Sequence, residues 1–242
     1  MEDQERITQQ NELPARALVV GDPERVLQAV GRLKSPVEVW RVREFLAWRG
    51  YFHGESVLIA SHGVGPSSAS LVLEQLFQRG VQIVLRAGTC GALQSEVTQG
   101  TLVIPTGAIR DDRISEQVLP LEVPAIADVD LVHGLQAEAA RAGYLQVSTG
   151  LVWSSGVFYD SPQVPARAPT WIASGAIAVE MEMALLLILA RRYSARAAGM
   201  LAVEGGADQE LDPWNRPVDS ETNQKMIQSM LDITLETLVS VA

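Results

Sequence analysis

Gln82-Ile83-Val84-Leu85-Arg86-Ala87-Gly88-Thr89-Cys90-Gly91-Ala92-Leu93 is the stretch on which the interpretation of the remaining sequence depends. Its apolar start predicts a buried strand, and the Gly-Thr-Cys-Gly segment predicts a turn that ends the strand. Arg86 at the carboxyl end of such a strand, followed by the Thr89 hydroxyl and exposed backbone N–H groups, is suited to bind an anion beyond the sheet. A plain turn without a ligand is the alternative that this stretch leaves open.

A second strand and turn lie near the N-terminus, where the apolar run 17–20 precedes Gly21-Asp22-Pro23-Glu24-Arg25. Asp22 suits the N-cap of a helix and Pro23 suits its first position. The backbone N–H groups of the turn, together with Arg25, would then face a ligand. A well-capped helix with a solvated arginine is the alternative.

Two further segments place polar residues beside predicted strands. Arg41 and Arg43 alternate along the sequence, so both are expected on the same side of a strand, as ligands or as an ion-paired surface. Ser61–Ser70 is another glycine-rich turn, and its small residues allow close approach of a ligand or a second subunit. His62 lies in this turn and is assigned no role, because a lone histidine is more often structural.

Ala176–Met183 is unusual because Glu180 and Glu182 interrupt an apolar run. Burying a carboxylate without partners is costly, so ligand hydroxyls or cations are expected near both side chains. In an extended segment the two carboxylates share one side, whereas a solvated acidic helix face is the alternative. Phe158 and Tyr159 follow small residues at another strand end, where an aromatic ring could stack on a base or close the core.

The alternation of strands and helices predicts an α/β fold: a single domain with a central mixed, mostly parallel β-sheet flanked by helices. Ligands of such sheets gather beyond the carboxyl ends of the strands, where each segment above lies. We expect an N-terminal extension over 1–16 and the domain over 17–242. The other expected elements are a hairpin over 37–51, strands at 57–60, 101–105, 146–153 and 196–203, helices at 128–142, 184–192 and 220–241, and loops at 111–128 and 162–169.

The composition limits the classes of partner. A chain of 242 residues, 47% hydrophobic and 20% charged, suits one large α/β domain. The formal charge of −10 argues against a nucleic-acid polymer or an anionic membrane, but not against a small anion, because salt screens distant charges within about 8 Å. Cys90 is the only cysteine, so a reducing cytoplasm is expected. No segment has the character of a secretory signal, a membrane span or a zinc site.

Taken together and in this order, the motifs resemble the nucleoside phosphorylase family, which includes uridine phosphorylase and bacterial hexameric purine nucleoside phosphorylase. The resemblance runs from Gly21 to the closing helix. The segments that carry it are 21–25, Arg43-Glu44-Phe45, 86–91, 154–159 and 179–182. The segment 120–128 is similar to the uridine phosphorylase branch in particular.

The resemblance implies an enzyme that cleaves the N-glycosidic bond of a nucleoside with phosphate, giving free base and ribose 1-phosphate or its deoxy form. It implies no cofactor and no metal, since inorganic phosphate is a co-substrate. The implied partners are therefore a nucleoside and phosphate. It also implies a cytoplasmic homo-oligomer built from dimers, with a hexamer expected.

The resemblance assigns four groups of site residues. Phosphate is expected to contact Gly21, Arg25, Arg86 and Thr89, with Arg43 reaching in from a neighbouring subunit. The ribose is expected to contact Glu180, Met181 and Glu182. The base is expected to contact Cys90, Gly91, Phe158 and Gln163. The candidates for catalysis are Arg86, Glu204 and Asp208.

Three departures from the family pattern leave the identity of the base open. Residues 1–17 contain no histidine, although the family places one there to touch the ribose across the dimer. The loop 159–164 lacks the arginine with which uridine phosphorylases read uracil, and Gln163 is out of register. Glu204-Gly205-Gly206 stands where purine enzymes carry the aspartate that protonates the leaving base, so Glu204 or Asp208 would substitute.

A phosphorylase of the uridine type is slightly favoured, with a purine nucleoside phosphorylase as the alternative. A nucleosidase, which uses water, is a further hypothesis, but water needs no clamp of three arginines at positions 25, 43 and 86. A non-catalytic nucleoside-binding protein is the hypothesis from another class. The missing histidine and the unassigned acid motivate it.

Overall fold

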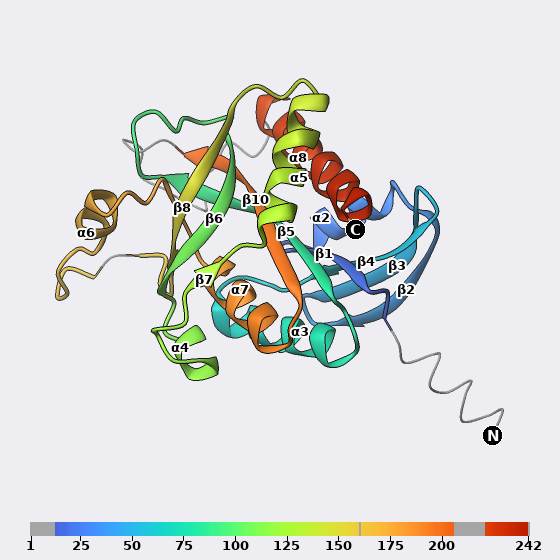
Figure 1. Ribbon diagram of the computed structural model, residues 1–242, viewed down its shortest axis with the longest axis horizontal. Helices are drawn as coiled ribbons and strands as arrows, with labels where there is room; N and C mark the ends of the chain where they lie inside the picture. The colour runs from blue at the N-terminus through green and yellow to red at the C-terminus, as the bar shows by residue number, and fades with distance from the viewer. Residues whose placement is uncertain (1–12, 160, 206–220, 242) are drawn as a thin grey trace.

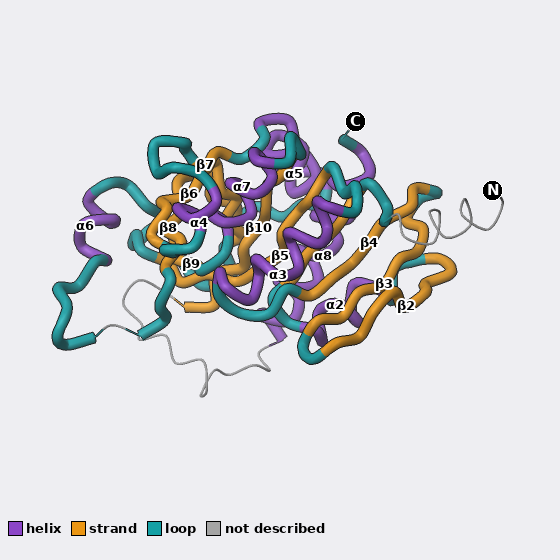
Figure 2. The backbone as a smooth tube through the Cα atoms, turned by 90° about the horizontal axis from the view of Figure 1, so that it is seen from below, coloured by secondary structure: helices purple, strands orange, loops and turns teal. Residues whose placement is uncertain are grey.

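The computed structural model describes residues 13–159, 161–205 and 221–241. One mixed β-sheet lies at its centre and helices cover both faces, as Figures 1 and 2 show. The predicted α/β class, with a single domain and a mixed sheet flanked by helices, is confirmed. Parallel and antiparallel pairings are equally numerous among the described strands, so the sheet is less parallel than expected.

The strands follow the chain from the N-terminal region to residue 205. They are β1 (Arg16–Val20), β2 (Lys34–Val42), β3 (Phe45–Phe52), β4 (Glu55–Ser61), β5 (Ile83–Ala92), β6 (Leu102–Asp111), β7 (Ala125–Ile126), β8 (Val147–Ser155), β9 (Ala178–Glu180) and β10 (Arg196–Gly205). The helices are α2 (Pro23–Val30), α3 (Pro66–Gln78), α4 (Ser115–Val118), α5 (Val129–Arg141), α6 (Ala168–Ala173), α7 (Met183–Arg192) and α8 (Glu221–Ser240).

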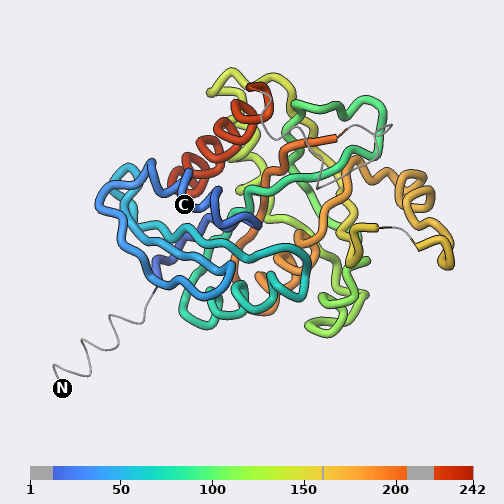
Figure 3. Tube along the Cα trace, turned by 180° about the vertical axis from the view of Figure 1, so that it is seen from behind, coloured from blue at the N-terminus to red at the C-terminus, as the bar shows by residue number. Residues whose placement is uncertain are grey.

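The sheet closes on itself at one end. β10 pairs with both β5 and β6, β6 pairs with β8, and β9 joins β8 back to β5, so five strands form a hydrogen-bonded ring. From β5 the sheet continues through β1 and β4 to β3 and β2. Figure 3 shows the β2–β4 end and the ring end, next to which α6 projects, at opposite sides of the molecule. β1 links these two parts, because it pairs with β5 of the ring on one side and with β4 on the other.

Apolar periodicity explains how the helices cover the sheet. α8 packs on β1, β5 and β10, and α5 packs against α8 on the same face, whereas α3 and α7 pack together on the other face (Figure 1). The predicted helices at 128–142 and 220–241 are confirmed as α5 and α8. Each buries apolar residues at helical spacing, namely Leu131, Leu135, Ala139, Met226, Met230, Ile233 and Leu238. α7 is buried on every side from Met183 to Ala190, so it is a core helix rather than an amphipathic one.

β5 continues through the segment that was expected to be a turn. Gly88 to Gly91 remain extended because β10 pairs with this half of β5 and β9 pairs with its last residues, so the backbone N–H and C=O groups have strand partners. The prediction of a turn there is wrong. β6 is likewise longer than expected, and it passes Pro105 by a register shift next to Gly107, where a residue without an N–H is tolerated.

The expected alternation of Arg41 and Arg43 on one strand is also wrong. β2 ends at Val42, and Arg43 lies in the tight turn to β3 with φ of +55°. The two side chains therefore belong to different local structures. Arg41 bonds to Glu38 on the exposed strand, whereas Arg43 is exposed at the turn.

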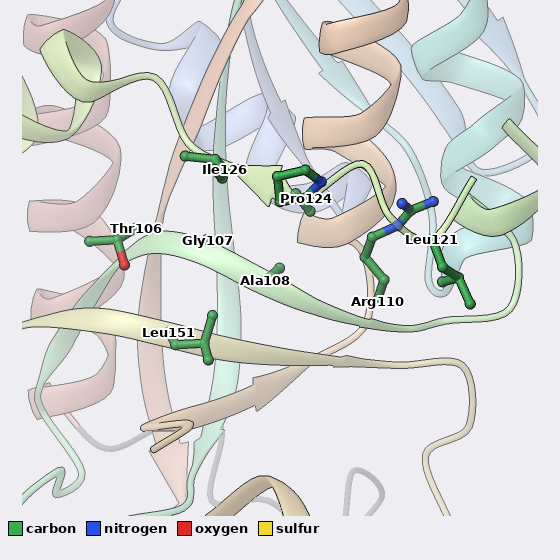
Figure 4. Close-up of a pocket in the computed structure, with 9 residues that line it drawn as sticks. Thr106, Gly107, Ala108, Arg110, Leu121, Pro124, Ile126 and Leu151 are labelled. Atoms are coloured by element: carbon green, nitrogen blue, oxygen red, sulfur yellow. The ribbon is translucent and has the colours of Figure 1, made fainter. Parts of the chain in front are cut away.

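Arg110 organises the connection from β6 to α5. Its guanidinium donates to four backbone carbonyls of this connection at 2.5 to 2.8 Å, those of Ser115, Leu119, Pro120 and Val123. The connection therefore contains the short elements α4 and β7 where the sequence suggested only a loop. Figure 4 shows Arg110 at the edge of a hollow over β6, β7 and β8, where it is the only charged side chain among the described residues that line it. None of the helices in the described residues has the length and apolarity needed to cross a membrane.

Asp128 is the N-cap of α5, and it also joins this helix to β10. Its side chain accepts from the Leu131 N–H at 3.0 Å and from Arg196 Nε at 3.0 Å. Burial alone would raise the pKa of Asp128. The Arg196 and Leu131 hydrogen bonds outweigh this effect, so the pKa lies below its ordinary value.

We expect Asp128→Ala to lower the free energy of unfolding by about 1–2 kcal/mol, as loss of a cap does, with a smaller loss for Asp128→Asn because asparagine still caps. Urea unfolding measures both changes. Since the folded pKa lies below the unfolded one, the contribution of the carboxylate is complete above the unfolded pKa and is lost as pH falls through the folded pKa. The wild type and Asp128→Asn should therefore converge in strongly acid solution. An alanine variant as stable as the wild type at neutral pH contradicts this account.

Candidate active site

Arg86 lies in the middle of the molecule, on β5 between Val19 of β1 and Gly199 of β10. It is 4% exposed, and a buried guanidinium is tolerated only with ionic and hydrogen-bonding partners. Its Nη2 pairs with Glu182 Oε2, its Nη1 lies 3.3 Å from Glu180 Oε2, and its Nε donates to His62 Nε2 at 3.4 Å. The structure therefore joins the arginine of the first motif to both carboxylates of the apolar segment.

Glu180 ends β9 and caps the start of α7. Its Oε2 accepts from the backbone N–H groups of Glu182 and Met183 at 2.8 and 2.9 Å, and its Oε1 accepts from the Ser154 hydroxyl. Burial raises the pKa of Glu180, against the opposing effect of Arg86. The several donors directed at this carboxylate explain how a charged group can occupy the core.

Glu182 connects Arg86 to the glycine-rich turn after β4. Its Oε1 accepts from the Gly65 N–H at 2.6 Å, while its Oε2 faces Arg86. Gly65 has φ of +84°, a conformation that side chains rarely adopt, and a Cβ at this position would lie 4.0 Å from Met181 Cε. Met181 and Glu182 therefore lie next to the Gly65 turn, whose backbone can approach them closely because Gly65 has no side chain.

Gly88 leaves room for the guanidinium of Arg86. A Cβ at Gly88 would fall 2.6 Å from Arg86 Cζ, a distance that real Cβ atoms do not reach. Although Nη1 lies near Glu180, it is buried and makes no hydrogen bond of good geometry within the described residues. Its N–H groups can therefore be donated to a ligand, and an anionic oxygen is the acceptor that such donors favour.

Arg25 lies in the first turn of α2, where Asp22 caps the helix by accepting from the Glu24 N–H at 2.8 Å. Its Nη2 is 3.2 Å from Glu204 Oε1 at the end of β10. The pKa of Arg25 is lowered, mainly by burial and also by the charge of Arg86, against the effect of Asp22. The positive charges of Arg25 and Arg86 therefore repel each other, and an anion bound between the two guanidinium groups would offset this repulsion.

The end of β1 completes this part of the site. A Cβ at Gly21 would lie 3.3 Å from the Gly63 carbonyl and 3.8 Å from His62 Cε1. Thr89, half-buried on β5, pairs with Ala202 of β10. Gly21, Arg25 and Arg86 are thus brought together from three segments, and Thr89 follows three residues after Arg86 on the same strand.

Other predicted site residues lie further from this cluster or outside it. The Arg43 side chain has no ion pair with any other described residue, but the neighbouring Glu44 approaches Gly63. Phe158 is 39% exposed and packs edge-on against Tyr159. Gln163 is exposed and bonds to Ser161. Asp208 lies outside the described residues.

Cys90 and Gly91 are buried on β5 beside the end of β10. The thiol of Cys90 faces the Ala202 carbonyl at 3.8 Å, and burial raises its pKa, so it is neutral at neutral pH.

Two residues around Arg86 had no role in the sequence interpretation. Ser154, which bonds Glu180, gives no local signal in an apolar strand, and His62 had only its place beside a glycine turn. Within the described residues, no group of three or more His, Cys, Asp or Glu side chains could hold a metal.

The model of the phosphorylase superfamily matches residues 15–238, so the chain belongs to this superfamily. A uridine phosphorylase of Klebsiella aerogenes is 36% identical over 198 residues, which cover 77% of this chain and 78% of the relative. A purine nucleoside phosphorylase of Plasmodium falciparum is 32% identical over 189 residues, 78% of this chain and 77% of the relative. A uridine phosphorylase of Haemophilus influenzae is 30% identical over 227 residues, 89% of each chain. The expected membership of the nucleoside phosphorylase family is confirmed.

We expect Gly88→Ala to displace the guanidinium of Arg86 from its two carboxylates and to lower the free energy of unfolding by about 1–3 kcal/mol, the usual cost of overpacking. Urea denaturation measures the loss. Gly31→Ala is the matched control, because Gly31 has a helical φ of −57° and the added Cβ would make only ordinary contact, 3.4 Å from the Gln28 carbonyl. Equal stabilities of the two alanine variants would show that Gly88 is not needed for the placement of Arg86.

Proposed function

We propose that the chain is a pentosyltransferase that cleaves the N-glycosidic bond of a nucleoside with inorganic phosphate, giving free base and (deoxy)ribose 1-phosphate. The observation that carries this proposal is the buried Arg86, which two glutamates hold by ion pairs. Its Nη1 makes no hydrogen bond of good geometry within the described residues, and its charge contributes to the lowered pKa of Arg25. Phosphate is a co-substrate, and the reaction uses no resident cofactor. The uridine and purine nucleoside phosphorylases among the relatives support the same reaction.

The phosphate site in this proposal consists of Gly21, Arg25, Arg86 and Thr89. Hydrogen bonds between charged groups contribute roughly 1.5–3 kcal/mol each, so two arginines can hold a phosphate dianion in a chain of net charge −10. Arg43 belongs to the site of the neighbouring subunit. Its exposed turn, its lack of an ion pair within the described residues and its nearness to the Gly63 turn support this placement.

The ribose site consists of Glu180, Met181 and Glu182, and Glu180 also holds Glu182 by accepting from its backbone N–H. Each oxygen of Glu182 already accepts one hydrogen bond, but a carboxylate oxygen can accept a second. Ribose hydroxyls can therefore bind without breaking the bonds to Gly65 and Arg86. Met181 lies beside the Gly65 turn, where it forms an apolar surface under the sugar.

The reaction passes through an oxocarbenium-like sugar. A phosphate oxygen forms the new bond to the anomeric carbon while the glycosidic bond breaks and its electron pair leaves with the base. Arg86 contacts both phosphate and Glu182, so it aligns the attacking oxygen with the sugar. Glu204 pairs with Arg25 and in this way orients the second arginine, and Glu204 or Asp208 supplies the proton to the leaving base.

Cys90, Gly91, Phe158 and Gln163 form the base site in this proposal. The segment 120–128 favours pyrimidine nucleosides, whereas the purine nucleoside phosphorylases among the relatives support purine nucleosides as the second candidate. The exposed ring of Phe158 can stack on either kind of base, since every base has an apolar face.

We also propose a cytoplasmic homo-oligomer built from dimers, as a hexamer. Val42, Val64 and Leu71 are large apolar residues that are each more than half exposed. They lie at the end of β2 next to Arg43, on the glycine-rich turn and on α3, and a partner subunit that needs Arg43 in its site would cover them. The single cysteine supports a reducing compartment.

A panel of purine and pyrimidine nucleosides, each incubated with and without phosphate, tests the reaction. We expect base release to require phosphate and to yield sugar 1-phosphate in equal amount, measured by chromatography of both products. Equal base release without phosphate would instead identify a nucleosidase. Nucleoside binding without any product after long incubation would identify a non-catalytic binding protein.

The proposal also predicts a division of labour between Arg86 and Glu182. Arg86→Lys and Arg86→Ala should raise the phosphate KM at least about tenfold and change the nucleoside KM much less, because they remove one or two charge-assisted bonds. Glu182→Gln should do the reverse. Arg41→Ala is the control, since its exposed ion pair with Glu38 contributes little. Equal losses for phosphate and nucleoside in the Arg86 variants count against the assignment.

A further inference from the structure

His62 is the one buried histidine of the chain. Its side chain is inaccessible at the end of β4, whereas His53 and His133 are exposed. A protonated imidazole in contact with an arginine would form a buried pair of like charges, so this contact disfavours the charged form of the ring. The function proposed above leaves this side chain without a role.

The backbone of His62 is held rigidly. Its N–H donates to the Val20 carbonyl at 2.9 Å, and its carbonyl accepts from Ser68 Oγ at 2.9 Å. The next residue, Gly63, has φ of +73°, and a Cβ there would collide with the Ser68 side chain. β1 and the start of α3 therefore fix the position of the His62 backbone, from which the imidazole extends.

One edge of the imidazole faces Gly21 and Arg86, two of the residues proposed to bind phosphate. Cε1 lies beside Gly21, and Nε2 lies 3.4 Å from Arg86 Nε. Arg86 can only donate, since a guanidinium has no acceptor and stays protonated. His62 Nε2 must therefore carry no hydrogen, which leaves the proton of a neutral ring on Nδ1.

The charges around the ring agree with a neutral imidazole. Burial is the main cause that lowers the pKa of His62 to about 4, with a smaller contribution from Arg86, against the opposing effects of Glu182 and the nearby backbone. At neutral pH the ring is thus uncharged and able to accept. Its Nδ1 is buried and makes no hydrogen bond within the described residues.

We propose that His62, as the Nδ1–H tautomer, is a positioning residue that sets the rotation of the Arg86 guanidinium by accepting from its Nε–H. The hydrogen bond to Glu182 holds Nη2 and the ion pair with Glu180 attracts Nη1, but neither contact holds Nε, and Gly88 provides no side chain to support the group. The third bond, at Nε, turns Nη1 toward the place of the phosphate. This inference rests on the phosphate site proposed above.

The tautomer is tested first, in the protein without substrates. Long-range proton–nitrogen NMR of the chain labelled with ¹⁵N-histidine distinguishes the nitrogen that carries hydrogen. With only three histidines, His62→Gln assigns the signal. We expect hydrogen on Nδ1 of His62 at neutral pH, and hydrogen on Nε2 would overturn the proposal. Because this result needs no turnover, it stands even if the chain fails to bind phosphate, an outcome that refutes only the proposed function.

The second test compares the phosphate Kd, measured by calorimetry, with the nucleoside KM. His62→Leu removes the acceptor, and we expect the phosphate Kd to rise about tenfold, the effect of about 1.4 kcal/mol, with the nucleoside KM within about twofold. His62→Gln places an amide oxygen near the Nε2 position and should restore the phosphate Kd to within about threefold of wild type. His53→Gln, on the exposed surface, is the control.

Equal phosphate Kd values for His62→Leu and His62→Gln, or equal losses for phosphate and nucleoside, overturn the positioning role. If the leucine variant does not fold, the tautomer of the wild type and the phosphate Kd of His62→Gln decide in its place. A glutamine variant that binds phosphate as weakly as Arg86→Ala also overturns it.

Discussion

The buried positive charge of Arg86 is the constraint that the surrounding structure satisfies. A guanidinium at 4% exposure needs partners for its charge and its donors, and they come from β4, β9 and the start of α7. The partners are themselves held by the Gly65 N–H, the Ser154 hydroxyl and two backbone N–H groups of α7. Both glutamates that pair with Arg86 are thus held by further hydrogen bonds, so the site is organised before any ligand binds.

The same arrangement explains how a chain of net charge −10 can bind an anion. Acidic groups on the surface act through water and salt, which screen their charge over about 8 Å. Arg25 and Arg86 act through the protein interior, where the interaction of charges is stronger. The excess acidity elsewhere therefore opposes the local site only weakly.

The sequence predicted the features that depend on neighbouring residues. A few neighbouring residues were enough to identify the helix caps Asp22 and Asp128. The same is true of the two buried glutamates, which stand out in an apolar run. The sequence did not predict the local structures that depend on partners far along the chain. Gly88 to Gly91 would form a turn alone but stay extended between β9 and β10, and Arg43 leaves its strand because β2 turns directly into β3. Ser154 and His62 could not be assigned because their partners lie 26 and 24 residues away.

The separations along the chain have a consequence for how the protein forms. Arg86 meets Glu182 across 96 residues, and Gly65 meets Glu182 across 117. Such distant pairings are made slowly, because a long loop must be ordered before they contribute. During synthesis, Arg86 emerges from the ribosome well before either glutamate. The nascent chain must leave this arginine hydrated until β9 docks, so the binding centre arises only in the final assembly of the ring of strands.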